Sequence, residues 1–381
     1  MSMKPLRRHV GIAIDGGGIK GLIVARALMA LEEELCCRSL IKSPQINILA
    51  GTSTGAILAA SMSIGMEAKE IVSAYREFGQ KIFPSLSPPW FPDPLRDADE
   101  FLRSILQRSL YPNKPLIDVL RATIEKKTAK ADLTLAELNE MLGPRKALVL
   151  TTVNVSERRT RFLKSYRKND GDWKLWEAVL ASSSVPPALP IWSRRENGKQ
   201  VYYTDGGVGS YGNPAFIAAR EATVFHGYGA RNVSILSFGT GWVEGDDYQK
   251  ENGVPSEWRG LDWARNAPDL FLGDAIRSQS LEVLQSRETG KIDFRRFQMG
   301  LDKNIPPDAF VSNATYARME QLGDEMGRRI RENHFAPNPD SKFDPEGLFS
   351  LRNRFLAAGE TGRRTARGFM RRFLRRTPGL V

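Results

Sequence analysis

Short apolar runs alternate with longer helical stretches along much of the chain. Four runs are apolar and partly β-branched, at residues 10–14, 46–50, 147–153 and 233–238. Such runs are typical of buried strands. The segments between them are longer and include stretches rich in good helix formers, as at residues 56–62. The alternation predicts an α/β fold with a mostly parallel central sheet covered by helices.

The pattern breaks in two internal regions. The first, between residues 83 and 116, contains a proline-dense stretch that excludes regular structure. We interpret it as an irregular surface crossing. The alternative is a lid or membrane-touching loop with Trp90 and Phe91 as interfacial anchors. Residues 246–290 are expected to be irregular as well, and a long polar helix is expected near residues 315–333.

The motif GTSTG at residues 51–55 joins a predicted strand to a predicted helix. It has the G-x-S-x-G pattern of a nucleophile elbow. Small residues on both sides of Ser53 permit a sharp bend and leave its hydroxyl at a helix N-terminus, where the helix dipole favours developing negative charge. A flexible loop is the simpler interpretation of the letters alone, but the flanking strand and helix favour a nucleophilic Ser53.

A second glycine-rich turn, DGGGIKG at residues 15–21, also lies between a predicted strand and a helix. Consecutive glycines tolerate positive φ, so their N–H groups can point toward one position. The dinucleotide motif G-x-G-x-x-G fits the letters, but the next strand runs into Ser53 instead of ending in an acidic residue. A P-loop does not fit, because no Lys-Ser or Lys-Thr pair follows the last glycine. Gly16, Gly17 and Gly18 are therefore the candidate oxyanion-binding residues.

The third motif is Asp-Gly-Gly at residues 205–207, after a strand-like run at residues 200–203. An Asp-Gly turn is common by itself, so only its combination with Ser53 makes Asp205 a candidate base. A free Asp has a pKa of about 4 and is a weak base, and burial would raise that pKa. No zinc or calcium ligand spacing is present, and no metal or other cofactor is expected.

The histidines His9, His226 and His334 offer a test of this interpretation. The order Ser53, Asp205 and then His226 or His334 fits the triad of an α/β-hydrolase, so a triad is an alternative. That fold normally places its serine elbow after several strands, whereas Ser53 follows about two. His226 lies in a loop-like segment and His334 at a predicted helix end, so a dyad is favoured.

In this order, the motifs resemble those of the patatin-like phospholipase family. The segments ASSSVPP at residues 181–187 and SFGTG at residues 237–241 are also similar to motifs of that family. The resemblance covers roughly residues 8–245. It implies a three-layer patatin-like fold and hydrolysis of lipid acyl esters. It also implies a dyad of Ser53 as nucleophile and Asp205 as base, with the glycine loop as oxyanion hole and no catalytic histidine.

The predicted function is a lipid acyl hydrolase of the phospholipase A or lysophospholipase type, with a phospholipid or another acyl-ester lipid as substrate. An acyltransferase could use the same dyad, and a non-catalytic acyl-lipid-binding protein is a further alternative. Some bacterial patatin-like proteins resemble this chain and act as nucleotide-gated effectors that degrade membranes. No motif here identifies a nucleotide site, so any small-molecule or protein activator is unknown.

Length and cysteine usage bear on domains and compartment. The 381 residues can form one large α/β domain, expected at residues 8–345. The only cysteines, Cys36 and Cys37, are adjacent, which suits a reducing compartment without a disulfide framework. A signal peptide is not recognisable and no apolar run approaches 18 residues, so a cytoplasmic protein is expected.

A basic C-terminal tail is expected at residues 346–381. Residues 352–381 hold nine arginines and one acid, which supplies +8 of the chain's +11 net charge. Phe369 and Phe373 fall on the apolar face of a predicted amphipathic helix. The opposite face holds Arg371, Arg372, Arg375 and Arg376. This pattern favours peripheral docking on an anionic membrane surface. A solvated tail and an arginine-rich nucleic-acid contact are the alternatives, and nucleic acid is disfavoured.

Overall fold

The computed structural model of the protein describes residues 3–82, 84, 103, 107, 109–243, 249–250, 252–285, 289–302, 305 and 312–334. The chain divides into two compact units, Met1–Phe335 and Ala336–Val381, and every described residue lies in the first. Trp90, Phe91 and the whole basic tail lie outside the described residues. Their membrane roles and the domain boundary at residue 345 therefore stay predictions.

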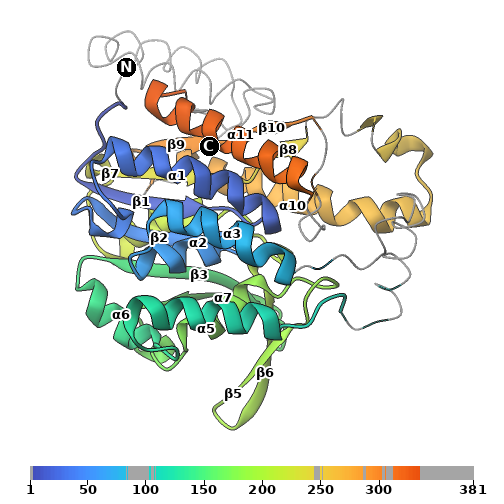
Figure 1. The fold of residues 1–381 in the computed structure, drawn as a ribbon, viewed down its shortest axis with the longest axis horizontal. Helices are drawn as coiled ribbons and strands as arrows, with labels where there is room; N and C mark the ends of the chain where they lie inside the picture. Colours follow the sequence, from blue (N-terminus) through green and yellow to red (C-terminus); the bar gives the residue numbers. More distant parts are fainter. Residues whose placement is uncertain are drawn as a thin grey trace, which may run out of the picture. The chain divides into compact units, whose positions relative to one another are not determined.

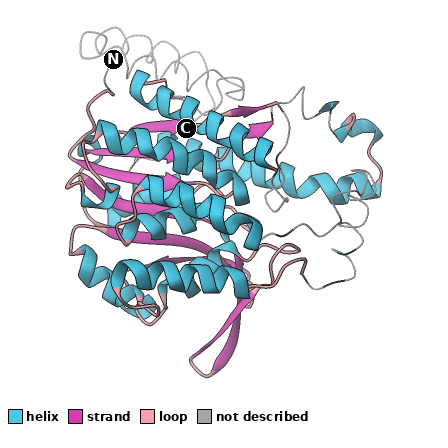
Figure 2. Cartoon of the chain, in the orientation of Figure 1, coloured by secondary structure: helices cyan, strands magenta, loops and turns pink. Residues whose placement is uncertain are grey.

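An eight-stranded sheet forms the centre of the first unit (Figures 1 and 2). Five strands run parallel in the spatial order β3 (Ala147–Asn154), β2 (Ile46–Thr52), β1 (His9–Ile14), β7 (Val233–Phe238) and β9 (Asp293–Phe297). Three further strands complete it: β4 (Arg159–Lys164) and β6 (Lys199–Asp205) pair antiparallel with β3, and β5 (Trp192–Glu196) pairs antiparallel with β6. The four predicted strands and the mostly parallel α/β sheet are confirmed. A separate two-stranded sheet pairs β8 (Trp242–Val243) with β10 (Gly300–Leu301).

Alternating side chains of the parallel strands divide the core into two layers. In β1, Val10, Ile12 and Ile14 belong to the main apolar core. Gly11 faces the other way, because a Cβ there would lie 4.0 Å from Ala218. That alanine belongs to α8 (Ala215–Arg220), which packs on β1, β2 and β7. Helices therefore cover both faces of the sheet, which confirms the predicted three-layer arrangement.

Several helices pack around the main core. They are α1 (Gly21–Glu34), α2 (Thr54–Ser63), α3 (Ala68–Ile82), α5 (Lys114–Thr128), α6 (Leu135–Leu142), α7 (Leu175–Ser183) and α11 (Asn313–Glu332). Figure 1 shows α1, α2 and α3 side by side, and α11 packs along α1. A capping box fixes the start of α6, where Thr134 and Glu137 bind each other's backbone N–H groups. The polar helix predicted near the end is confirmed as α11.

Short turns connect these elements. The 3-10 turns are Gly18–Lys20, Leu40–Lys42, Lys168–Asp170, Gly206–Val208, Ala230–Asn232 and Pro255–Glu257, and a π-turn spans Glu221–Phe225. Among the described residues, no helix is both long enough and apolar enough to cross a bilayer.

The prediction of an irregular region at residues 246–290 was wrong for most of its length. Residues 260–285 form the 26-residue helix α10 (Gly260–Gln285). The sequence reads as broken because Gly260, Pro268 and Gly273 disfavour a helix in isolation. Tertiary packing decides otherwise, since α10 lies against α8 and the turn that follows β6.

Candidate active site

Strands β2 and β6 meet end to end along one edge of β3. Strand β2 pairs with β3 as far as Thr52 opposite Thr151, and Asp205 of β6 lies opposite the next residue, Thr152. Strand β4 occupies the other edge of β3 over these residues. Because β6 runs antiparallel to β3, its last residue faces the end of β2, where Ser53 follows. The register therefore brings Ser53 and Asp205 together.

Ser53 is the residue at which β2 turns into α2. Its backbone has φ 56° and ψ −123°, an unfavourable conformation for a residue with a side chain. A Cβ at Gly51 would lie 2.1 Å from the carbonyl oxygen of Gly55, and one at Gly55 would lie 2.1 Å from that of Ile14. Neither position has room for a side chain, which explains the two glycines of the motif. The turn leaves Ser53 at the N-terminus of α2, 8% exposed.

The Asp205 carboxylate is buried beside Ser53. Its Oδ1 accepts the N–H of Gly207 at 2.6 Å, and the Ser53 side chain lies close enough to lower its pKa. Burial raises the pKa of Asp205 to about 6, although the hydrogen bonds from Ser53 and Gly207 oppose that shift. At neutral pH the carboxylate is therefore mostly ionised, yet it is more basic than a free Asp.

Residues 182–184, at the C-terminal end of α7, form hydrogen bonds with the backbones of Ser53 and Asp205. We call this segment the serine clamp. Ser182 Oγ accepts the N–H of Ser53 at 3.0 Å, and Ser183 Oγ donates to the Ser53 carbonyl oxygen at 3.2 Å. The carbonyl oxygen of Ser184 accepts the N–H of Asp205 at 3.0 Å. All three serines are buried. This segment belongs to the ASSSVPP motif, whose role was not evident from the sequence.

The glycine loop passes directly beside Ser53, because a Cβ at Gly16 would lie 3.2 Å from the Ser53 Cβ. At Gly17, a Cβ would lie 2.1 Å from the hydroxyl oxygen of Thr240, and Gly18 has φ 58°. Within the part of the chain that the structure describes, the Gly17 and Gly18 amides have no acceptor. Two backbone amides of the loop that passes Ser53 are therefore without an acceptor in the described part of the chain.

Gly16 plays a different part from the other two glycines. Its N–H donates to the carbonyl oxygen of Gly212 at 2.9 Å, and its own carbonyl oxygen accepts from Thr240 Oγ1 at 2.8 Å. Both of its backbone polar groups are thus used to hold the loop in place. The Gly16 N–H is therefore already bonded to Gly212, and Gly17 and Gly18 remain the candidate oxyanion donors.

A buried ion pair fixes the chain just before this loop. The Arg296 guanidinium binds both carboxylate oxygens of Asp15, with Nη1 2.8 Å from Oδ1, and Nη1 also donates to Ser237 Oγ at 2.8 Å. Asp15 is 0% and Arg296 2% exposed. Burial raises the pKa of Asp15, and the Arg296 charge opposes this rise. The pair therefore ties β9 to the start of the glycine loop.

Sequence reasoning missed Arg296. Its strand, DFRRF, does not read as buried, because two adjacent arginines are rarely found inside a protein. The available signal was Asp15 itself, since an acid between an apolar strand and a glycine loop needs a buried cation or donor.

The histidines do not complete a triad. His9 begins β1 and its ring stacks on Tyr228, with 3.8 Å between the ring centroids. His226 lies near the same tyrosine, with Nδ1 3.0 Å from the carbonyl oxygen of Glu221. These two histidines are at the amino end of the parallel strands, roughly 16 Å along β1 from the glycine loop. His334 is exposed just after α11.

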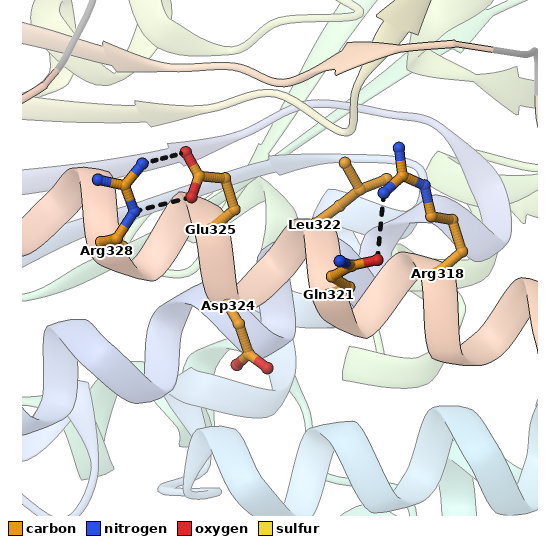
Figure 3. Close-up of a pocket in the computed structure, with 6 residues that line it drawn as sticks. All are labelled: Arg318, Gln321, Leu322, Asp324, Glu325 and Arg328. Carbon is orange, nitrogen blue, oxygen red and sulfur yellow. Dashed lines mark hydrogen bonds and ion pairs between the residues drawn. The ribbon is translucent and has the colours of Figure 1, made fainter.

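One shallow depression elsewhere on the surface lies along α11. It is lined by Arg318, Gln321, Leu322, Asp324, Glu325 and Arg328 (Figure 3). Its charges are paired, Glu325 with Arg328 and Asp324 with Arg26. Its lining contains neither Ser53 nor Asp205 and no residue of the glycine loop. Among the described residues, no group of three His, Cys, Asp or Glu side chains is arranged to hold a metal ion.

Comparison with known proteins assigns the family. A family profile described as patatin-like phospholipase matches residues 12–219, more than half of the chain. The chain therefore belongs to the patatin-like phospholipase family, a family of lipid hydrolases. The expectation raised by the motifs is confirmed at this level.

The individual relatives share limited sequence identity with this chain. The chain is 26% identical over 344 residues to a cGAMP-activated phospholipase of Vibrio cholerae, covering 86% of this chain and 91% of that protein. It is 24% identical over 376 residues to Patatin-2-Kuras 3 of Solanum tuberosum, covering 90% and 88%. Among solved structures, VipD from Legionella pneumophila has a TM-score of 0.43 and 12% identity, covering 87% of this chain and 68% of VipD.

Replacing Arg296 with Met should lower the free energy of unfolding by about 3–5 kcal/mol, because Asp15 would stay buried without its partner. Urea unfolding at neutral pH measures the loss. The double variant Asp15→Asn, Arg296→Met should recover part of it, because no unpaired charge remains. As a matched control, Arg328→Met on the surface of α11 should leave the midpoint nearly unchanged. Equal effects of Arg296→Met and Arg328→Met would contradict the anchoring role.

Proposed function

We propose that this protein is a lipid acyl hydrolase of the phospholipase A or lysophospholipase type, and that it works through a Ser53–Asp205 dyad. The observation that carries the proposal is the junction of β2 and β6 on β3. This junction supports the proposal because Ser53 precedes α2, the buried Asp205 carboxylate lies next to Ser53, and the glycine loop passes beside Ser53. Membership of the family supplies the substrate class, an acyl-ester lipid.

In the first half of the reaction, Asp205 accepts the proton of the Ser53 hydroxyl as Ser53 Oγ attacks the ester carbonyl. Its raised pKa makes Asp205 a better base than a free carboxylate, while leaving it ionised at neutral pH. The N–H groups of Gly17 and Gly18 stabilise the oxyanion, typically by about 3 kcal/mol per donor. Collapse of the tetrahedral intermediate returns the proton to the leaving alcohol and leaves an acyl ester on Ser53.

In the second half, water takes the place of the alcohol. Asp205 accepts a proton from water as it attacks the acyl-Ser53 carbonyl, and the same two amides bind the new oxyanion. Collapse releases the fatty acid, and Asp205 returns the proton to Ser53 Oγ. An alcohol in place of water would make the protein an acyltransferase by the same steps. Product analysis with and without an added lysolipid acceptor separates these outcomes.

The non-catalytic alternative is an acyl-lipid-binding protein with the same fold. A fluorophosphonate probe distinguishes it, because only an activated serine reacts covalently with the probe. Labelling that is lost in Ser53→Ala supports the hydrolase. A wild-type protein that binds lipid but resists the probe would favour the binding protein.

The names of two bacterial relatives bear on the assay. Those of Vibrio cholerae and Escherichia coli are cGAMP-activated phospholipases, 26% and 25% identical to this chain. We therefore propose to measure hydrolysis with and without cGAMP. Absence of turnover in both conditions, on ester lipids and on a soluble ester alike, would contradict the hydrolase.

Ser53→Ala and Asp205→Asn should each lower kcat/KM by about 10³-fold or more, because the first removes the nucleophile and the second its base. Hydrolysis of a soluble monomeric ester measures this, and circular dichroism checks that the variants are folded. His226→Ala is the matched control and should keep most of the activity. If it were as inactive as Ser53→Ala, a histidine-dependent mechanism would replace the dyad.

The pH profile should report Asp205. Below its folded-state pKa of about 6 the carboxyl is protonated and cannot accept the serine proton. We expect kcat/KM to fall about tenfold per pH unit below that value and to level off above it. A profile on the soluble ester that stays flat down to the ordinary Asp range near 4 would contradict a buried Asp205 as base.

The basic tail is proposed as a peripheral membrane anchor. Deleting residues 360–381 should weaken binding to anionic vesicles, and the loss should be larger at low salt because arginine attraction is screened. The residual apolar contribution of Phe369 and Phe373 should resist salt. Vesicle sedimentation across a salt series measures both terms. Equal binding of intact and truncated protein at low salt would contradict the membrane role and favour a solvated or partner-binding tail.

A further inference from the structure

Helix α10 exposes three large apolar side chains. Trp263 is 48%, Leu270 41% and Phe271 74% exposed. At about 100° per residue, Trp263 and Leu270 lie nearly in line along the helix and Phe271 lies in the next row. We call these three residues the α10 apolar face. A single exposed apolar residue is ordinary, but three on one face of one helix mark an interaction surface.

The opposite side of α10 is fixed at the candidate active site. Leu272 Cδ2 would lie 3.5 Å from a Cβ at Gly207, two residues after Asp205. One turn further on, the Asn213 side chain donates to the Ile276 carbonyl oxygen at 3.1 Å and to Ser280 Oγ at 2.8 Å. The helix is therefore held against the turn that carries the dyad carboxylate, while the apolar face points away from that turn.

The apolar face lies in the first half of α10. Just before this helix in the chain, Trp258 packs edge to face on Trp263, with 5.1 Å between ring centroids. Figure 1 shows the first half of α10 extending beyond the edge of the sheet. The α10 apolar face therefore lies on the part of the helix that projects beyond the sheet.

The charges of α10 indicate which partner fits. The helix contains two basic and four acidic residues, so an anionic surface would not be attracted to it. Trp and Phe are the residues that favour the boundary between lipid headgroups and acyl chains. An electrically neutral lipid surface therefore matches both the apolar residues and the acidic balance.

We propose that the α10 apolar face inserts into the surface of a zwitterionic lipid bilayer. The inference rests on the proposed function for its biological meaning. Lipid binding can be tested separately from hydrolysis, because contact by Trp263, Leu270 and Phe271 requires no turnover. The face differs from the basic tail in its preference: the tail selects anionic lipid and is salt-sensitive, whereas α10 binds neutral lipid and resists salt.

The experiment uses the full chain and vesicles of diether phosphatidylcholine, which contain no acyl ester to hydrolyse. The test variant is Trp263→Ser, Phe271→Ser. Its matched control is Met141→Ser, Val155→Ser, because these side chains are 55% and 42% exposed away from α10. We expect the test variant to bind vesicles about tenfold or more weakly than wild type and the control within about twofold. Wild-type binding should hold between about 0.1 and 0.5 M NaCl.

Several results would overturn the proposal. They are test-variant binding equal to wild type, an equal loss in the control, and loss of wild-type binding at high salt. If wild type without lipid sedimented as a dimer and the test variant as a monomer, the face would be an interface between copies. If the double variant unfolds, the single variant Phe271→Ser provides the same test.

Failure of the wild type to hydrolyse a soluble ester would contradict the proposed function, but it would not affect the result of the vesicle experiment.

Discussion

The edge of β3 is the constraint on which the candidate site depends. A strand has two edges, and β4 fills one of them along residues 149–154. Strands β2 and β6 must share the other edge, and they do so at the consecutive residues Thr151 and Thr152. A slip of one residue in β6 would turn Asp205 to the opposite face of the sheet. The β5–β6 hairpin and the N–H bond from Asp205 to the serine clamp resist such a slip.

Burial raises the pKa of the Asp205 carboxylate, and it also has an energetic cost that hydrogen bonds from the surroundings must offset. Polar groups removed from water are unfavourable unless they find partners. Around the junction they do: Thr52 Oγ1 lies 2.6 Å from both Thr151 Oγ1 and the carbonyl oxygen of Tyr211, and the serine clamp binds both backbone groups of Ser53. The environment that raises the pKa of Asp205 is therefore a satisfied polar network inside an apolar shell.

The glycine loop is held at its first residues by contacts from three other parts of the chain. Arg296 fixes Asp15 on one side, and Thr240 and Gly212 fix the backbone of Gly16. Fixed donors need little reorganisation when charge develops, which is why preorganised amides are effective in catalysis. Gly16 therefore anchors the loop, whereas the N–H groups of Gly17 and Gly18 have no acceptor among the described residues.

Local sequence by itself determined the four apolar strands, the elbow at Ser53, the glycine loop, the Asp205 turn and the polar helix near the end. These signals are local, since periodicity and glycine spacing act through neighbouring residues. Only the tertiary structure decided the rest. Strand β9 carries two buried arginines and α10 contains a proline, so their own residues argue against them. The partners that compensate, Asp15 for Arg296 and the turn after Asp205 for α10, are distant in sequence and close only in the fold.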